Sequence, residues 1–216
     1  MRPHLLPLMF SLALSGSVNA ADTVDTADAA SPVTRTNTLT FTTEQREFLK
    51  EPCVGEQRKE VRQAIRFLAN HDEEIHAFYE RFRADTLRLV EDKDSWEAAF
   101  PEINVVDLIR KRRRHTTTYC APEAQDPPVV KYDFNAVTLG WPSEADPSGA
   151  FVLSPLAFDG QDFCGVVKTV MHEWTHLHTG LHHTTATPYD GDVITMLSKF
   201  AKTACVNEGL GVWQER

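Results

Sequence analysis

The sequence predicts an α+β protein that is mainly helical and carries a small β-sheet. Three observations predict it: apolar residues spaced three or four apart between residues 56 and 90, β-branched and aromatic segments after residue 120, and a capped amphipathic helix near residue 170. The 216 residues are 42% hydrophobic and 25% charged, a composition typical of globular proteins. The length fits one domain of ordinary size.

The first half of the domain is expected to be helical. Thr42 and Gln45 have the spacing of a capping box, which predicts a short helix through Leu49. A third helix is expected from 96 to 109, punctuated by Pro101. Between these, residues 56–90 predict one long broken helix or two packed helices, with apolar positions Val61, Ile65, Leu68, Ile75, Phe78, Phe82, Leu87 and Val90.

Strands are expected after Cys120, where prolines exclude a regular helix. The β-branched and aromatic segment 129–139 predicts one strand, and 151–153 predicts a short second strand that ends before Pro155. Two further helices follow. The first covers 164–178, with Asp162 as N-cap and Gly180 as a left-handed C-terminal residue, and the last covers about 190–206.

The N-terminal residues are typical of an export signal. An apolar run follows Arg2 and ends in the small residue Ala20, which predicts a signal peptide over 1–20. Residues 21–41, rich in Ala, Asp, Thr and Ser, are expected to form a flexible leader, so that the folded domain covers 42–216. No later segment has the apolar length of a membrane span. A secreted or periplasmic protein is expected.

The four cysteines agree with export. They are an even, widely spaced set without a Cys-x-x-Cys pair, and they predict two disulfides in an oxidising compartment. Their spacing alone permits three pairings. The residues are Cys53, Cys120, Cys164 and Cys205.

A formal net charge of −9 argues against general affinity for nucleic acid or anionic membranes. The basic run 110–114 stands out in this acidic chain. We interpret it as the solvated end of a helix, where cations favour the helix dipole. Binding of a polyanion is the alternative interpretation.

The segment His172-Glu173-Trp174-Thr175-His176 carries the clearest chemical signal. Histidines at i and i+4 lie on one helix face, so both imidazoles can reach one zinc ion. The intervening Glu173 can deprotonate a water whose pKa the metal lowers. This arrangement is that of the zincins. The apolar residues Val167, Val170 and Trp174 are expected to pack the opposite face of the helix.

A catalytic zinc needs a third protein ligand. His182 has the spacing of the metzincin pattern without its glycine, whereas His183 follows Gly180 without that spacing. Glu208 resembles the third ligand of gluzincins, at a longer interval. Asp190 is the fourth candidate.

Beyond this motif, most of residues 44–216 resemble the aspzincins, the deuterolysin and peptidyl-Lys metallopeptidase family. The resemblance implies an α+β, zincin-like metallopeptidase with zinc on His172, His176 and Asp190 and with Glu173 as general base. It also implies Cys53–Cys120 and Cys164–Cys205 disulfides. The matching residues are Cys53 before an amphipathic helix, Tyr119-Cys120-Ala121, Tyr132, Phe151 to Pro155, Phe158, the His-Glu-x-x-His helix, a Thr close before an Asp, and Ala204 to Glu208.

The chain departs from the aspzincin pattern around Asp190. Two residues separate Thr187 from Asp190 where the family has one, and Val193-Ile194 stands in place of Tyr-Gly. Asp192 therefore competes as ligand. The family tyrosine would stabilise a developing oxyanion, a role for which Tyr189 is the substitute candidate. Some family members prefer a lysine after the cleaved bond and use acidic residues of the last helix for it. Here only Glu208 lies nearby, so this preference is not expected.

These features predict an exported zinc metalloendopeptidase that acts on a protein or peptide substrate. Three alternatives stay open: a non-catalytic zinc-binding or protein-binding module, and a metzincin-type or gluzincin-type peptidase with a different third ligand. The sequence does not determine the oligomeric state.

Overall fold

The computed structural model describes residues 41–123, 130, 132, 134–159, 162–183 and 192–210. All of them belong to one structural unit, Arg35–Arg216. The predicted signal peptide, most of the predicted leader, and Asp190 with its neighbour Tyr189 lie outside the described residues.

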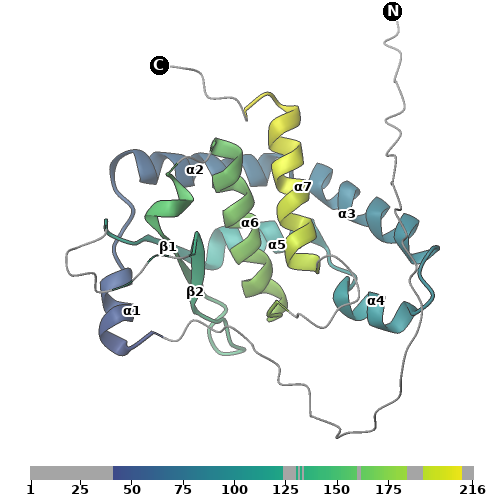
Figure 1. Ribbon diagram of the computed structural model, residues 1–216, viewed down its shortest axis with the longest axis horizontal. Coiled ribbons are helices and arrows are strands. Elements are labelled where there is room, and N and C mark those ends of the chain that lie inside the picture. The colour runs from purple at the N-terminus through teal and green to yellow at the C-terminus, as the bar shows by residue number, and fades with distance from the viewer. Residues whose placement is uncertain are drawn as a thin grey trace, which may run out of the picture. The chain divides into compact units, whose positions relative to one another are not determined.

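The described residues form seven α-helices, one short 3-10 helix and three strands, which confirms the predicted α+β class and its small sheet (Figure 1). The elements are α1 Thr43–Leu49, α2 Gly55–Asn70, α3 Asp72–Leu87, α4 Lys93–Ala99, α5 Val105–His115, β1 Thr116–Cys120, β2 Ala136–Gly140, β3 Gly149–Leu153, η1 Pro155–Ala157, α6 Phe163–Thr179 and α7 Val193–Asn207.

Local signals fix several helix boundaries as predicted. The Thr42 side chain accepts from the backbone N–H of Gln45, and the Gln45 side chain accepts from that of Thr42, so α1 begins with the expected capping box. The apolar positions from Val61 to Leu87 belong to two helices, α2 and α3, which are divided at His71, while Val90 lies beyond the end of α3.

The prediction of a single helix over 96–109 is wrong, because two helices, α4 and α5, cover this region. Pro101 lies between α4 and α5, because proline lacks the N–H of a helical residue and disfavours helix at the residue before it. The second helix, α5, begins with its own N-cap, Asn104, and continues to His115. Within its basic run Arg112 is only 1% exposed, so the run is not uniformly solvated.

The sheet has the strand order β1-β3-β2. Strand β3 pairs in parallel with β1 and antiparallel with β2, so β2 lies at an edge. The strand β1 was not predicted, because it follows α5 directly and no turn residue separates the two. The strand predicted over 129–139 is wrong for the described residues before Ala136, where β2 begins.

Helix α6 lies at the centre of the core. It packs against α7, α2 and α5 and also contacts β2 and β3. The predicted apolar face of Val167, Val170 and Trp174 is buried, as expected. At the C-terminal half of α6 the sheet approaches closely, because a Cβ on Gly149 would lie 2.9 Å from Leu177 Cδ2.

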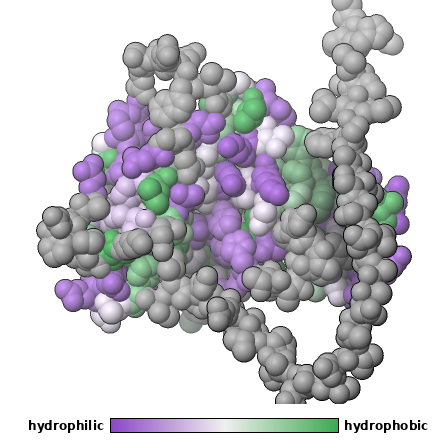
Figure 2. Space-filling model, in the orientation of Figure 1, coloured by the Kyte–Doolittle hydropathy of each residue, from purple (hydrophilic) through white to green (hydrophobic). Residues whose placement is uncertain are grey.

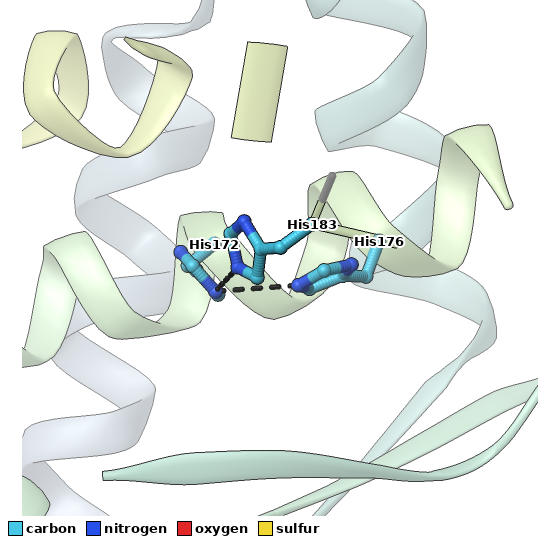
Figure 3. Close-up of side chains that lie close together, drawn as sticks. All are labelled: His172, His176 and His183. Carbon is cyan, nitrogen blue, oxygen red and sulfur yellow. Dashed lines mark hydrogen bonds between the residues drawn. The ribbon is translucent and has the colours of Figure 1, made fainter. Parts of the chain in front are cut away.

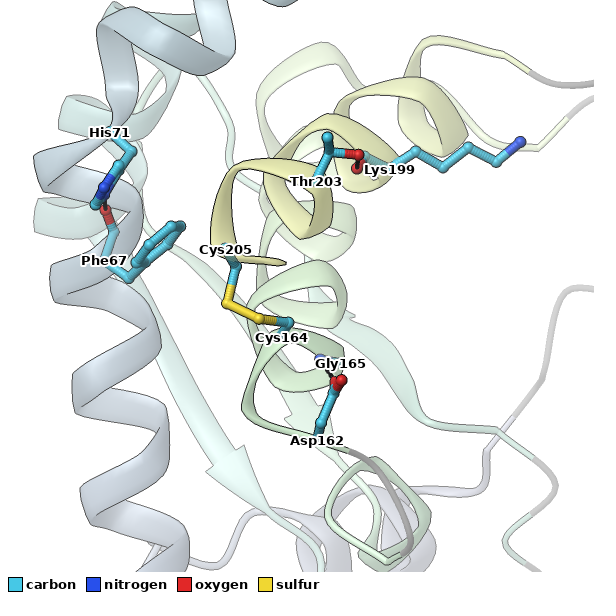
Figure 4. Close-up of a disulfide and its surroundings, with 8 residues drawn as sticks. All are labelled: Phe67, His71, Asp162, Cys164, Gly165, Lys199, Thr203 and Cys205. Atoms are coloured by element: carbon cyan, nitrogen blue, oxygen red, sulfur yellow. Dashed lines mark hydrogen bonds between the residues drawn. A yellow bond between two sulfur atoms is a disulfide. The ribbon is translucent and has the colours of Figure 1, made fainter. Parts of the chain in front are cut away.

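Two disulfides join distant segments, and their pairing is the one that the family resemblance implies. Cys53–Cys120 ties the segment before α2 to the end of β1. Cys164–Cys205 ties the first turn of α6 to the last turn of α7, and both residues are fully buried (Figure 4). Two disulfides are consistent with an extracellular protein.

Hydrophilic side chains dominate the described part of the face in Figure 2, where hydrophobic residues form separate patches. None of the described helices has the length and apolarity to cross a membrane.

Replacing Cys164 and Cys205 together by alanine is expected to lower the free energy of unfolding by about 4 kcal/mol, since the bridge closes a sequence separation of 41 residues. Urea denaturation of the variant and the wild type measures this difference. A midpoint equal to that of the wild type would contradict the expectation and show that packing alone holds α6 to α7.

Candidate metal centre

Helix α6 places His172, Glu173 and His176 in register because it is continuous from end to end. Asp162 caps its start by accepting from the Gly165 N–H at 2.8 Å, and Gly180 ends it with φ 70°. The Nε2 atoms of the two histidines are 3.3 Å apart. The predicted common face of these histidines is therefore confirmed.

His183 joins these two histidines from the segment that follows the helix. Its Nε2 lies 3.0 Å from His172 Nε2, and its ring centroid is 4.8 Å from those of both His172 and His176. Figure 3 shows the three rings side by side. The left-handed Gly180 allows this return, because it turns the chain sharply at the end of α6.

Outer hydrogen bonds orient two of the three rings. The Nδ1 atom of His176 lies 2.8 Å from the Leu181 carbonyl oxygen, and that of His183 lies 2.9 Å from Asp192 Oδ2. A ring that donates through Nδ1 keeps the Nε2 lone pair for a metal. Both rings therefore have the tautomer that a metal ligand needs.

Asp192, predicted as a competing ligand, contacts the Nδ1 side of His183 and the start of α7. It is the N-cap of α7, where Oδ1 accepts from the Thr195 N–H at 2.9 Å while Oδ2 binds His183. The sequence signal for this cap was an aspartate directly before the apolar start of the last helix. Asp192 therefore links the beginning of α7 to the third histidine.

The remaining third-ligand candidates lie elsewhere or outside the described residues. The His182 ring packs on Trp141, with centroids 4.8 Å apart. Glu208 is at the C-terminal end of α7, where its Oε1 lies 3.8 Å from His71 Nε2. Asp190 falls outside the described residues.

Burial sets the protonation of His172 and His176 on α6. Desolvation, with the charges of His176 and His183 adding to it, lowers the pKa of His172 to about 3. Desolvation also lowers the pKa of His176. Both imidazoles are therefore neutral near pH 7, the form that binds metal.

The pKa of His183 is set mainly by its hydrogen bond to Asp192. The hydrogen bond to Asp192 raises the pKa of His183. Burial alone would raise the pKa of Asp192, but hydrogen bonds from His183 and Thr195 outweigh it and lower that pKa to about 2. Asp192 is therefore an ionised acceptor at neutral pH.

Glu173 lies beside the histidines, 3% exposed, between α6 and the sheet. Its Oε2 accepts a 3.0 Å hydrogen bond from the Thr138 hydroxyl on β2. Desolvation raises its pKa to about 7, although Thr138 and His183 act in the opposite direction. A carboxyl group with a pKa near neutrality can both accept and donate a proton at physiological pH.

The three histidines are close enough together to hold one metal ion. Two ligands on one tetrahedral zinc ion, each at about 2.0–2.1 Å, have donor atoms about 3.3 Å apart. The observed Nε2 separations are 3.3 and 3.0 Å, and candidate donor atoms of all three residues lie within 4.8 Å of one another. Among the described residues, His172, His176 and His183 therefore form a candidate metal centre.

No protein-family model, curated protein or solved structure matches the chain.

Replacing Asp192 by serine is expected to lower zinc affinity 10- to 100-fold, because serine can still cap α7 but is too short to hold His183. Competition with a chromophoric chelator measures the affinity, and thermal unfolding checks the fold. Asp162→Ser, the same change at the N-cap of α6, is the matched control. Equal zinc affinity in Asp192→Ser and the wild type would contradict a positioning role.

Proposed function

We propose that this chain is an exported zinc endopeptidase that hydrolyses peptide bonds without a covalent intermediate. The observation that carries the proposal is the convergence of the His172, His176 and His183 imidazoles, with the buried Glu173 next to His172 on α6. Three protein ligands and an adjacent carboxylate are the donor set of a catalytic rather than a structural zinc site. The two disulfides agree with export.

His172, His176 and His183 would hold the ion, which when bound supplies a Lewis acid for the peptide carbonyl and lowers the pKa of a water molecule. Glu173 would accept the proton of that water and deliver it to the leaving amine. Thr138 fixes one carboxylate oxygen of Glu173 for these transfers. Burial of Glu173 supports both, because its pKa of about 7 suits a group that is first base and then acid.

The edge strand β2 supports a peptide as substrate. It carries Thr138 next to Glu173, and an extended peptide can add to such an edge through main-chain hydrogen bonds. One carbonyl of the strand, that of Leu139, already accepts from Arg46 Nη1 on α1. We expect the substrate to pair with β2 along this edge, on the strand that holds Thr138 against Glu173.

The family resemblance and the geometry propose different third ligands. The aspzincin pattern implies Asp190, whereas among the described residues it is His183 that lies close to His172 and His176. We propose His183, because its ring is held by Asp192 with Nε2 facing His172.

The choice of ligand is tested with His183→Ala and Asp190→Ala. Loss of His183 is expected to weaken zinc binding at least 100-fold, whereas loss of Asp190 leaves it within a few-fold of the wild type. Zinc content after dialysis against a chelator buffer measures both. Tight zinc binding by His183→Ala together with loss in Asp190→Ala would contradict the assignment and favour the aspzincin ligand set.

The general base is tested with Glu173→Gln, which keeps the size of the side chain. Peptide cleavage by the zinc-loaded variant is expected to fall at least 100-fold, while zinc content stays stoichiometric, because glutamine cannot accept the proton. Glu208→Gln, a carboxylate at the far end of α7, is the control and should keep full activity. Cleavage by Glu173→Gln at the wild-type rate would refute the role.

A non-catalytic zinc-binding module is the second candidate, and one observation favours it. Val193 and Ile194, which stand where the aspzincins have Tyr-Gly, are fully buried in α7. These positions therefore supply no hydroxyl to an oxyanion. A wild-type protein that binds zinc tightly but cleaves no peptide would favour this module.

A further inference from the structure

Trp141 is a large aromatic side chain left partly in solvent beside the candidate metal centre. It directly follows β2, and it is 43% exposed. Its ring centroid lies 4.8 Å from that of His182 and 6.3 Å from that of His176, to which the ring stands edge-on. One side of the indole therefore contacts His176 and His182, and part of the indole is open to solvent.

Two segments far apart in the sequence form this aromatic surface. Trp141 comes from the end of the edge strand, and His182 comes from the turn after α6, between Gly180 and the proposed ligand His183. A peptide that adds to β2 would pass the end of the strand and meet this pair. The position suits contact with a side chain close to the scissile bond.

The metal centre does not need Trp141 for its own geometry. His176 is already oriented by the Leu181 carbonyl, and His183 is oriented by Asp192. The contact between the Trp141 ring and His176 adds no hydrogen bond to this arrangement. An exposed indole that is not required for ligand orientation is free to bind something else, and tryptophan is enriched at binding hot spots.

The charges around the histidines favour binding of an uncharged substrate side chain. Two carboxylates of the described residues contact this site or its histidines, and both are engaged, Glu173 by Thr138 and Asp192 by His183 and the α7 backbone. Neither of these two is therefore positioned as a counter-ion for a basic side chain. The remaining attraction is that of ring faces for apolar and aromatic groups.

We propose that Trp141 and His182 form a substrate subsite, here called the aromatic subsite, which binds a large apolar or aromatic side chain next to the scissile bond. This inference rests on the proposed peptidase function. It defines the substrate class as peptides with Phe, Tyr, Trp or Leu at one position flanking the cleaved bond.

The test is cleavage-site profiling of a peptide library by the zinc-loaded wild type, Trp141→Ala and Trp141→Phe. Leu89→Ala, which removes an 84% exposed apolar side chain outside the site, is the matched control. We expect the wild type and the control to prefer a large apolar residue at one flanking position. Trp141→Ala should lose 10- to 100-fold in kcat/KM for such peptides and little for alanine-flanked ones. Trp141→Phe should restore most of the preference.

Zinc affinity and thermal unfolding of the same variants separate recognition from structure. Both should stay at wild-type values in Trp141→Ala, because the ligands are held by other groups. A changed zinc affinity with an unchanged cleavage preference would overturn the aromatic subsite and make Trp141 a support of His176. An unchanged preference with unchanged zinc affinity would overturn it as well.

A binding measurement keeps failure of the subsite distinct from failure of the peptidase proposal. Calorimetry of zinc-loaded Glu173→Gln, with and without Trp141→Ala, compares a phenylalanine-containing peptide with its alanine analogue. Tighter binding of the phenylalanine peptide that depends on Trp141 supports the subsite even if the wild type cleaves nothing. Equal binding of both peptides overturns the subsite, whatever the wild type cleaves.

Discussion

The burial of α6 is the constraint on which the rest of the structure depends. This helix is enclosed by α7, α2, α5 and the sheet, and most of its residues are buried. Its apolar residues fill the core, while His172, Glu173 and His176 occupy the side that meets β2 and the segment after the helix. Desolvation of that side keeps the imidazoles on α6 neutral and raises the pKa of Glu173. The same packing that stabilises the fold therefore prepares the candidate site for a metal.

Helix α7 completes the site through the residue that caps its start rather than through its apolar face. Asp192 caps α7 and holds His183, so the start of one helix and the ring of one histidine are fixed by the same carboxylate. At the other end of α7, the disulfide from Cys205 to Cys164 ties it to the beginning of α6. The two long helices are thus joined by a covalent bond at one end and by the Asp192–His183 contact near the other.

The sequence-based predictions were correct where the signal lies within one helical turn and less accurate where a boundary depends on distant residues. The capping box at Thr42, the Asp162 cap and the left-handed Gly180 were all correct, because each depends on residues within one turn. The strand β1 was missed because Thr116 both ends α5 and begins the strand, so the pattern has no break there. The segment 129–139 looked like a strand over its whole length, yet only pairing with β3 decides where a strand begins, and that pairing starts at Ala136.

The α+β class, the helix that carries His172, Glu173 and His176, and the even set of cysteines follow from the sequence, since helical spacing and composition act locally. Which third side chain meets His172 and His176 follows from the packing of separate elements. His182 and His183 are adjacent in the chain, but the Asp192 carboxylate at the start of α7 holds His183 toward His172, while His182 packs on Trp141 from the end of β2. Those partners come from separate elements, so their arrangement follows from how α6, α7 and the sheet pack together.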